Sequence, residues 1–192
     1  MRFRRAAAVV PSKRPTYSSS WVGIDGFNDS SLIQTGTEQD FVNGSAQYYA
    51  WWEILPAPET VIPAMAVQPG DTMTASIVET SAGSGSWAIQ IADTRSGQSF
   101  TTTQSYGGPL SSAEWIEEAP TVGGHVATLA NYAETTFDPG TANGANPGLV
   151  TSDGGVMIQH SAQVSTPSVP DTSGVGFNIQ YGSTSPAPPS GS

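Results

Sequence analysis

Apolar and polar residues alternate with a period of two along most of this 192-residue chain, and turn-forming residues interrupt the alternation every ~8–15 residues. No window sustains the 3.6-residue period of an amphipathic helix. A period of two puts successive side chains on opposite faces of a strand. The sequence therefore predicts an all-β fold, an antiparallel two-sheet β-sandwich. The expected strands cover residues 21–25, 31–37, 46–55, 64–67, 72–79, 87–92, 98–104, 113–117, 127–137, 156–159 and 175–181.

The chain divides by composition into a basic N-terminal arm (residues 1–15), a sandwich domain (16–182) and a flexible Pro/Ser/Gly tail (183–192). The arm begins like a signal peptide, but its apolar stretch is shorter than the ~7–15 residues that a signal peptide needs. It is a pro-segment remnant, an engineered start or a plain disordered arm. As a pro-segment, it would pair with the acidic body at neutral pH and be trimmed in acid.

Charge is distributed very unevenly. The net charge is −10, and five of the six basic residues lie in the arm. From Thr16 onward the sequence contains all sixteen acidic residues and only one Lys or Arg residue, Arg95. Such a body does not attract phosphate backbones or anionic lipids, so we expect no nucleic-acid or membrane partner. Because the chain has no Cys, disulfides, thiol nucleophiles and cysteine zinc sites are excluded.

The scarcity of basic residues indicates adaptation to acid. Below about pH 3 most carboxylates are protonated, so this body would carry little charge and little self-repulsion. Its polarity comes instead from 25 Ser and 20 Thr. General acidity for solubility or for high salt is the alternative, although halophilic surfaces usually remain rich in charge.

Histidine chemistry is not indicated. His125 and His160 are the only histidines, 35 residues apart in the sequence, and we expect each to be a turn or surface residue. No metal site and no cofactor motif is evident. Carboxylates and carboxamides remain as candidate catalytic groups.

Five short motifs occur in one order, and together they resemble the glutamic peptidases, or eqolisins. They are WVGIDG (21–26), LIQTG (32–36), YAWWE (49–53) followed by Pro56, AEWIE (113–117), and LANYA (129–133) followed by TF (136–137). The resemblance covers approximately residues 20–160. Each motif alone is weak evidence, and their shared order is strong evidence.

The resemblance implies two seven-stranded antiparallel sheets of lectin-like or jelly-roll-like form, and a substrate cleft on one concave face. It implies an acid endopeptidase that is insensitive to pepstatin, needs no cofactor and cleaves polypeptide substrates. By motif, the catalytic residues are Gln34 and Glu114, and Trp21 and Asp25 are substrate-binding residues of the cleft. We further expect a secreted monomer that works in an acidic environment.

The chain departs from the fungal relatives in two ways. They use disulfides, whereas this chain has no Cys, which suggests a bacterial-type member. Their Gln-Thr-Gly is followed, two positions after the Gly, by Asp, where this chain has Glu38. The roles of Glu38, Glu53 and Glu118 are open at this point.

A Glu–Gln pair suits hydrolysis in acid. Peptide hydrolysis needs a base and a donor for the developing oxyanion. We expect hydrogen bonds to keep the pKa of Glu114 low, so that it activates water at about pH 2–4. The Gln34 amide keeps its N–H donors at every pH.

Other interpretations of these residues exist. A Glu or Gln on a strand is commonly a solvated face residue, Trp21 could be a core residue, and Asp25 could close a turn before Gly26. The alternative function is a carbohydrate-active β-sandwich, either a glycoside hydrolase or a sugar-binding module. A retaining hydrolase needs two carboxyl groups about 5–5.5 Å apart, and the residue two positions after Glu114 is Ile116.

Overall fold

The computed structural model describes residues 2–4 and 8–190, and its elements are nearly all strands. The only helix among these residues is a single 3-10 turn, Thr151–Asp153. The all-β prediction is confirmed. The strands are β1 (Arg2–Arg4), β2 (Ser19–Ile24), β3 (Ile33–Val42), β4 (Ser45–Ile54), β5 (Thr60–Ala66), β6 (Thr72–Glu79), β7 (Ser86–Asp93), β8 (Ser99–Ser105), β9 (Ala113–Glu118), β10 (Thr121–Val122), β11 (His125–Val126), β12 (Glu134–Phe137), β13 (Met157–Gln159), β14 (Ala162–Pro167) and β15 (Phe177–Tyr181).

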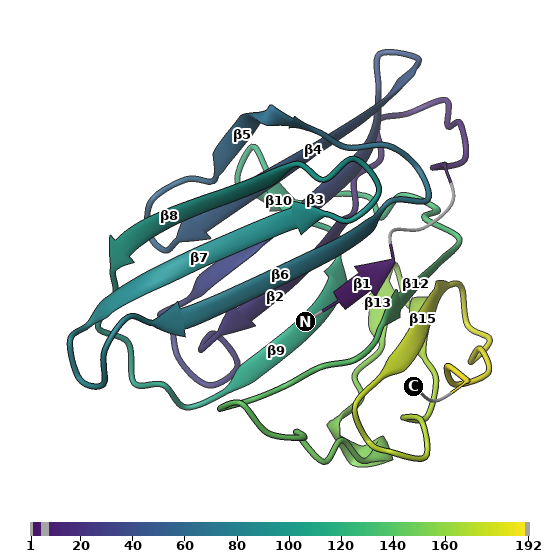
Figure 1. The fold of residues 1–192 in the computed structure, drawn as a ribbon. Coiled ribbons are helices and arrows are strands. Elements are labelled where there is room, and N and C mark those ends of the chain that lie inside the picture. Colours follow the sequence, from purple (N-terminus) through teal and green to yellow (C-terminus); the bar gives the residue numbers. More distant parts are fainter. Residues whose placement is uncertain (1, 5–7, 191–192) are drawn as a thin grey trace.

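Two antiparallel sheets form a sandwich (Figure 1). One has the order β13-β14-β15-β12-β1-β6-β7-β8, and the other has the order β5-β4-β3-β2-β9. Strands β10 and β11 form a separate hairpin directly after β9. The expected count of seven strands in each sheet is therefore wrong for the described residues, which form sheets of eight and five.

The main core lies between the two sheets. It joins Val22 and Ala50 of the five-stranded sheet to Met73 and Ile91 of the eight-stranded sheet. Because side chains alternate along a strand, the neighbours of these core residues point to the other face of the five-stranded sheet. A second apolar cluster lies there, formed by Trp21, Leu32 and Trp51.

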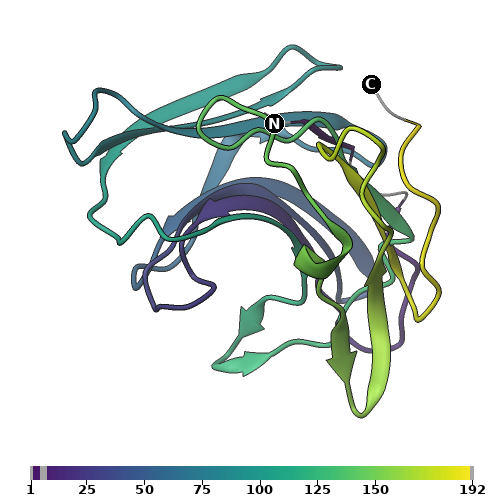
Figure 2. The same ribbon diagram turned by 90° about the horizontal axis from the view of Figure 1, so that it is seen from below.

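The five-stranded sheet is strongly curved. Figure 2 shows it as an arch whose concave side faces away from β6, β7 and β8, with β10, β11, β13 and β14 below the arch in that view. We call this concave side the hollow face. Its side chains come from the odd-numbered residues of β2 and β4 and from their even-numbered partners on β3 and β9.

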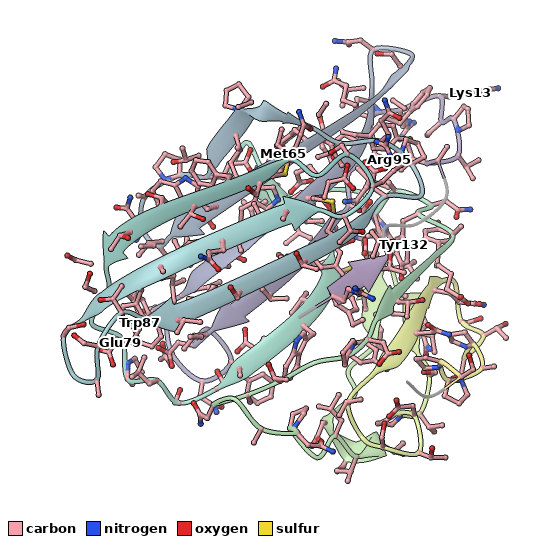
Figure 3. All side chains as sticks on the ribbon, in the orientation of Figure 1. Lys13, Met65, Glu79, Trp87, Arg95 and Tyr132 are labelled. Carbon is pink, nitrogen blue, oxygen red and sulfur yellow. The ribbon has the colours of Figure 1, made fainter. Side chains whose placement is uncertain are left out.

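The N-terminal segment does not stand apart from the sandwich. Strand β1 pairs with both β6 and β12, so it joins two parts of the eight-stranded sheet. Phe3 is buried in the core, and its ring centroid lies 5.7 Å from that of Phe137. Val9 is also buried. In Figure 3, by contrast, Lys13 projects away from both sheets. The boundary that we expected after residue 15 is not a break in the described structure.

The C-terminal tail also has partners. The Asn178 side-chain amide donates to the Ala187 carbonyl at 2.9 Å, and the Ser185 hydroxyl donates to the Pro167 carbonyl at 2.9 Å. The described part of the tail is therefore hydrogen-bonded to β15 and β14, although its composition suggested that it had nothing to pack against. No helix within residues 2–4 and 8–190 is long and apolar enough to cross a membrane.

Candidate active site

Gln34 and Glu114 lie on the hollow face in one row across three strands. Gly23 on β2 is the register partner of Gln34 on β3 and also of Glu114 on β9. Since neighbouring strands are about 4.8 Å apart, the two outer Cα atoms are about 10 Å apart. Gly23 has no side chain to fill the space between them. The structure thus brings together the two residues that the motifs indicate as catalytic.

Trp21 covers the middle of this row. A Cβ atom on Gly23 would lie only 2.7 Å from Cζ3 of the Trp21 ring. The Trp21 side chain is buried, and its Nε1 donates to Oε1 of Glu118 at 3.0 Å. Trp21 is therefore packed against the row in the apolar cluster with Trp51, on the face where we expected the cleft.

Glu114 is held by donors that precede it in the chain and by a loop after β2. The Ser112 hydroxyl donates to its Oε1 at 2.7 Å, and the backbone of Phe27 also donates to the carboxyl. Burial nevertheless raises the pKa of Glu114, and the charges of Asp25 and Asp29 act in the same direction. The expectation of a lowered pKa is wrong, because desolvation outweighs these hydrogen bonds.

Gln34 is held from the opposite side. Glu53 on β4 is its register partner, and the Gln34 Nε2 donates to Glu53 Oε2 at 2.5 Å. The Gln34 Oε1 is buried and has no hydrogen-bond partner among the described residues. Burial raises the pKa of Glu53, with a further increase from Glu59, while the bond from Gln34 lowers it.

Asp25 lies beneath the loop that leads into β9. It is fully buried, and its backbone has a φ of 68°, in the left-handed region. Tyr106 Oη donates to its Oδ2 at 2.6 Å, Leu110 N donates to Oδ2 at 3.0 Å, and Ser111 N donates to Oδ1 at 2.5 Å. Burial favours a higher pKa for Asp25, but these bonds outweigh it and lower the pKa. The carboxylate thus fixes residues 106–111, just before Ser112 and Glu114.

A second group of carboxyls lies further along the hollow face, and sequence reasoning assigned it no role. Glu38 and Asp40 are two residues apart on β3, so they share that face, and both are buried. Burial and the neighbouring carboxyl raise the pKa of Glu38, and burial raises that of Asp40 to about 6. Glu59, hydrogen-bonded to Tyr49, adds a further negative charge nearby. The signal in the sequence was the spacing of acidic residues at even positions of one strand.

Neither histidine belongs to the site. His125 lies in β11 and His160 lies in the turn between β13 and β14, and both are exposed, as expected. Within residues 2–4 and 8–190, no group of three or more His, Cys, Asp and Glu residues is arranged to hold a metal ion.

Comparison with known proteins gives the family. The sequence matches the peptidase A4 family over residues 4–181, nearly its whole length. The chain belongs to the peptidase A4 family. This peptidase A4 chain is 29% identical over 153 residues to Aspergillopepsin-2 from Aspergillus niger, which covers 78% of the chain and 54% of that protein. It thus spans about half the length of this curated relative.

Solved structures of peptidases have the same fold. The crystal structure of aspergilloglutamic peptidase from Aspergillus niger matches this peptidase A4 chain with a TM-score of 0.73 and 27% identity, over 86% of the chain and 99% of that structure. Scytalido-glutamic peptidase, solved with a transition state analog inhibitor, matches with a TM-score of 0.73 over 94% of the chain and 91% of its own. At 20% identity, the second match shows the shared fold. The family match favours a peptidase over the carbohydrate-active alternative.

Proposed function

We propose that this chain is an acid endopeptidase that hydrolyses peptide bonds in unfolded polypeptides, with Glu114 and Gln34 as catalytic residues and no cofactor. The observation that carries the proposal is the single row of Gln34, Gly23 and Glu114 in a member of the peptidase A4 family. Gly23 leaves room for the Trp21 ring, which packs over it between the two side chains.

In the first step, the Glu114 carboxylate takes a proton from the water, and the water oxygen attacks the scissile carbonyl carbon. One N–H of the Gln34 amide is bound to Glu53, and the other stabilises the oxyanion. In the second step, Glu114 returns its proton to the amine nitrogen as the C–N bond breaks. The carboxyl product retains the water oxygen, and no covalent enzyme intermediate forms.

The raised pKa of Glu114 changes the expected pH dependence. A carboxyl with the ordinary value of 4.5 is only about 3% ionised at pH 3, and Glu114 is ionised less than this. A higher pKa also makes the carboxylate a stronger base. The optimum should therefore lie above the range of about pH 2–4 that the sequence suggested.

Asp25 enters this scheme as a positioning residue. Its carboxylate is fully buried and bound to residues 106–111, so it holds the segment that delivers Ser112 and Glu114. Trp21, packed over Gly23, is the residue that we propose to contact the substrate.

The proposal includes three properties suggested by the resemblance and by composition: insensitivity to pepstatin, secretion into an acidic environment, and activity as a monomer. Acidic surroundings suit this chain because the carboxyls of the hollow face lose charge there. Secretion is tested by locating the protein in the producing cells, and the monomer by sedimentation.

A digestion assay tests the function. The purified chain is incubated with a denatured protein from pH 2 to pH 7, with and without pepstatin, and new N-termini are identified. The proposal expects internal cleavage in acid that pepstatin does not reduce. Release of sugars from a neutral polysaccharide, with no cleavage of protein, would support the carbohydrate-active alternative instead.

A further inference from the structure

We infer that Glu53 is a positioning residue that selects the orientation of the Gln34 side-chain amide. Its catalytic consequence rests on the proposed function, whereas the selected orientation itself does not. The two residues face each other across β4 and β3, and Glu53 Oε2 accepts from Gln34 Nε2 at 2.5 Å.

The contact distinguishes the two ends of the amide. An ionised carboxylate only accepts hydrogen bonds, whereas an amide has a donor end and an acceptor end. If the Gln34 amide turned by 180°, its Oε1 would face the lone pairs of Glu53. In the observed orientation Nε2 meets Glu53, and Oε1 is buried without a hydrogen-bond partner among the described residues. Because Oε1 accepts no hydrogen bond from these residues, it does not fix the orientation of the amide. The hydrogen bond to Glu53 therefore selects that orientation.

The selected orientation leaves one N–H of Gln34 available for the oxyanion. A carboxamide that rotates freely would present its oxygen for part of the time, and an oxygen repels an oxyanion. Glu53 is thus connected to the reaction through Gln34 and touches no reacting atom itself.

The selection depends on the charge of Glu53 and hence on its surroundings. The carboxyls whose charges couple to Glu53 are Glu59, which precedes β5, and Glu118 on β9. The only ion pairs within the described residues are those of Arg95 with Asp71 and Asp93, so no cation holds Glu53 ionised there. When Glu53 is protonated, its O–H can donate to an amide oxygen, and the preference for Nε2 weakens.

The orientation can be observed without any activity. The side-chain amide signals of Gln34 are assigned by ¹⁵N-labelled NMR and followed from pH 3 to pH 7 in the wild type, Glu53→Gln, Glu53→Ala and a control, Glu134→Gln. Glu134 is an exposed residue of β12 in the other sheet. We expect one Gln34 amide proton in the wild type and the control to be shifted downfield, and to move as Glu53 titrates. In both Glu53 variants this pH dependence should vanish.

Kinetics then test the consequence. We expect kcat to fall about 10- to 100-fold in Glu53→Ala, because one charge-assisted hydrogen bond is lost, with KM within about twofold. Glu53→Gln can still accept through its own oxygen, so it should retain more activity than Glu53→Ala. The acid limb of the pH–rate profile of this variant should also lose the component that comes from the titration of Glu53. The control should stay within about twofold of the wild type.

Two results would overturn the inference: Gln34 signals that do not respond to pH or to Glu53→Gln, or a Glu53→Ala enzyme that is folded and keeps kcat within twofold. A failure of the proposed function is distinguishable from both. In that case the NMR response would remain, and neither the wild type nor any variant would cleave protein.

Discussion

Gln34 and Glu114 are eighty residues apart in the sequence, yet both are register partners of Gly23 and lie on the same face of one sheet. Their separation is therefore set by two strand spacings and does not depend on a flexible loop. The same row continues to Glu53, which lies beside Gln34 on β4. The ring of Trp21 packs over Gly23. A perturbation at the centre of the row should thus reach both of the side chains that we propose to be catalytic.

Gly23→Ala tests this central position. The added methyl group would lie 2.7 Å from the Trp21 ring and 3.1 Å from Cδ1 of Leu32. We expect a loss of stability of about 1–3 kcal/mol from overpacking and at least a tenfold loss of cleavage rate. Gly155→Ala is the matched control, because a Cβ there meets nothing within 4 Å. Equal rates for the two variants would show that the packing over Gly23 does not set the geometry of Gln34 and Glu114.

Asp25→Asn tests the loop that leads to Glu114. The Asn side chain would turn one acceptor oxygen into a donor facing other donors, so we expect a loss of about 3 kcal/mol in the free energy of unfolding. Chemical denaturation at pH 5 measures this loss, with the exposed Asp153→Asn as a control. Because the folded-state pKa of Asp25 is lowered, its contribution is present above 3.8 and is lost as the pH falls through the folded value. A difference that grows below pH 3.8 would contradict the assignment.

The raised pKa values of Glu38 and Asp40 predict that the fold is more stable in acid than at neutral pH. Their folded-state pKa values are raised, so stability is gained as the pH falls through about 6 for Asp40, and the gain is complete below 3.8. We expect the wild-type Tm to be higher at pH 4 than at pH 7. Glu38→Gln should reduce this difference in Tm, because it removes a buried carboxyl with a raised pKa, and the exposed Glu134→Gln should not. A Tm that is higher at pH 7 would refute the prediction.

Phe3→Ala tests whether the N-terminal segment belongs to the fold. Phe3 is buried between β6 and β12 and packs against Phe137, so we expect a loss of about 3–5 kcal/mol. Arg2→Ala, at an exposed neighbouring position, should cost under about 1 kcal/mol. Removal of this segment in acid should thus destabilise the enzyme, in contrast to the trimming hypothesis. If Phe3→Ala unfolds at the same denaturant concentration as the wild type, β1 is dispensable.

The sequence alone could predict the strands that have one face in the core. The alternation located β2 to β9 to within a few residues, because half-buried strands require it. It missed β1, β10, β11 and β14, and it overextended β12, which begins only at Glu134. Strand β1 is three residues long and exists through its pairing with β6 and β12, which no local pattern reveals.

The sequence indicated candidate residues for the site but not their arrangement. The ordered motifs indicated Gln34 and Glu114, while their common partner Gly23 depends on the register of three strands. The burial of Asp25 depends on a loop some eighty residues later in the chain. The direction of the pKa shift of Glu114 was mispredicted, because burial of a strand residue depends on the elements that fold over it.

The central claim is that Glu114 and Gln34 together perform hydrolysis. The most direct measurement is the rate at which Glu114→Gln and Gln34→Ala cleave a denatured protein at pH 4, with thermal unfolding of each variant measured in the same buffer. We predict that both variants fold, that Glu114→Gln loses about 10²- to 10⁴-fold in rate, and that Gln34→Ala loses about 10²- to 10³-fold. Folded variants that both cleave at near the wild-type rate would contradict the account.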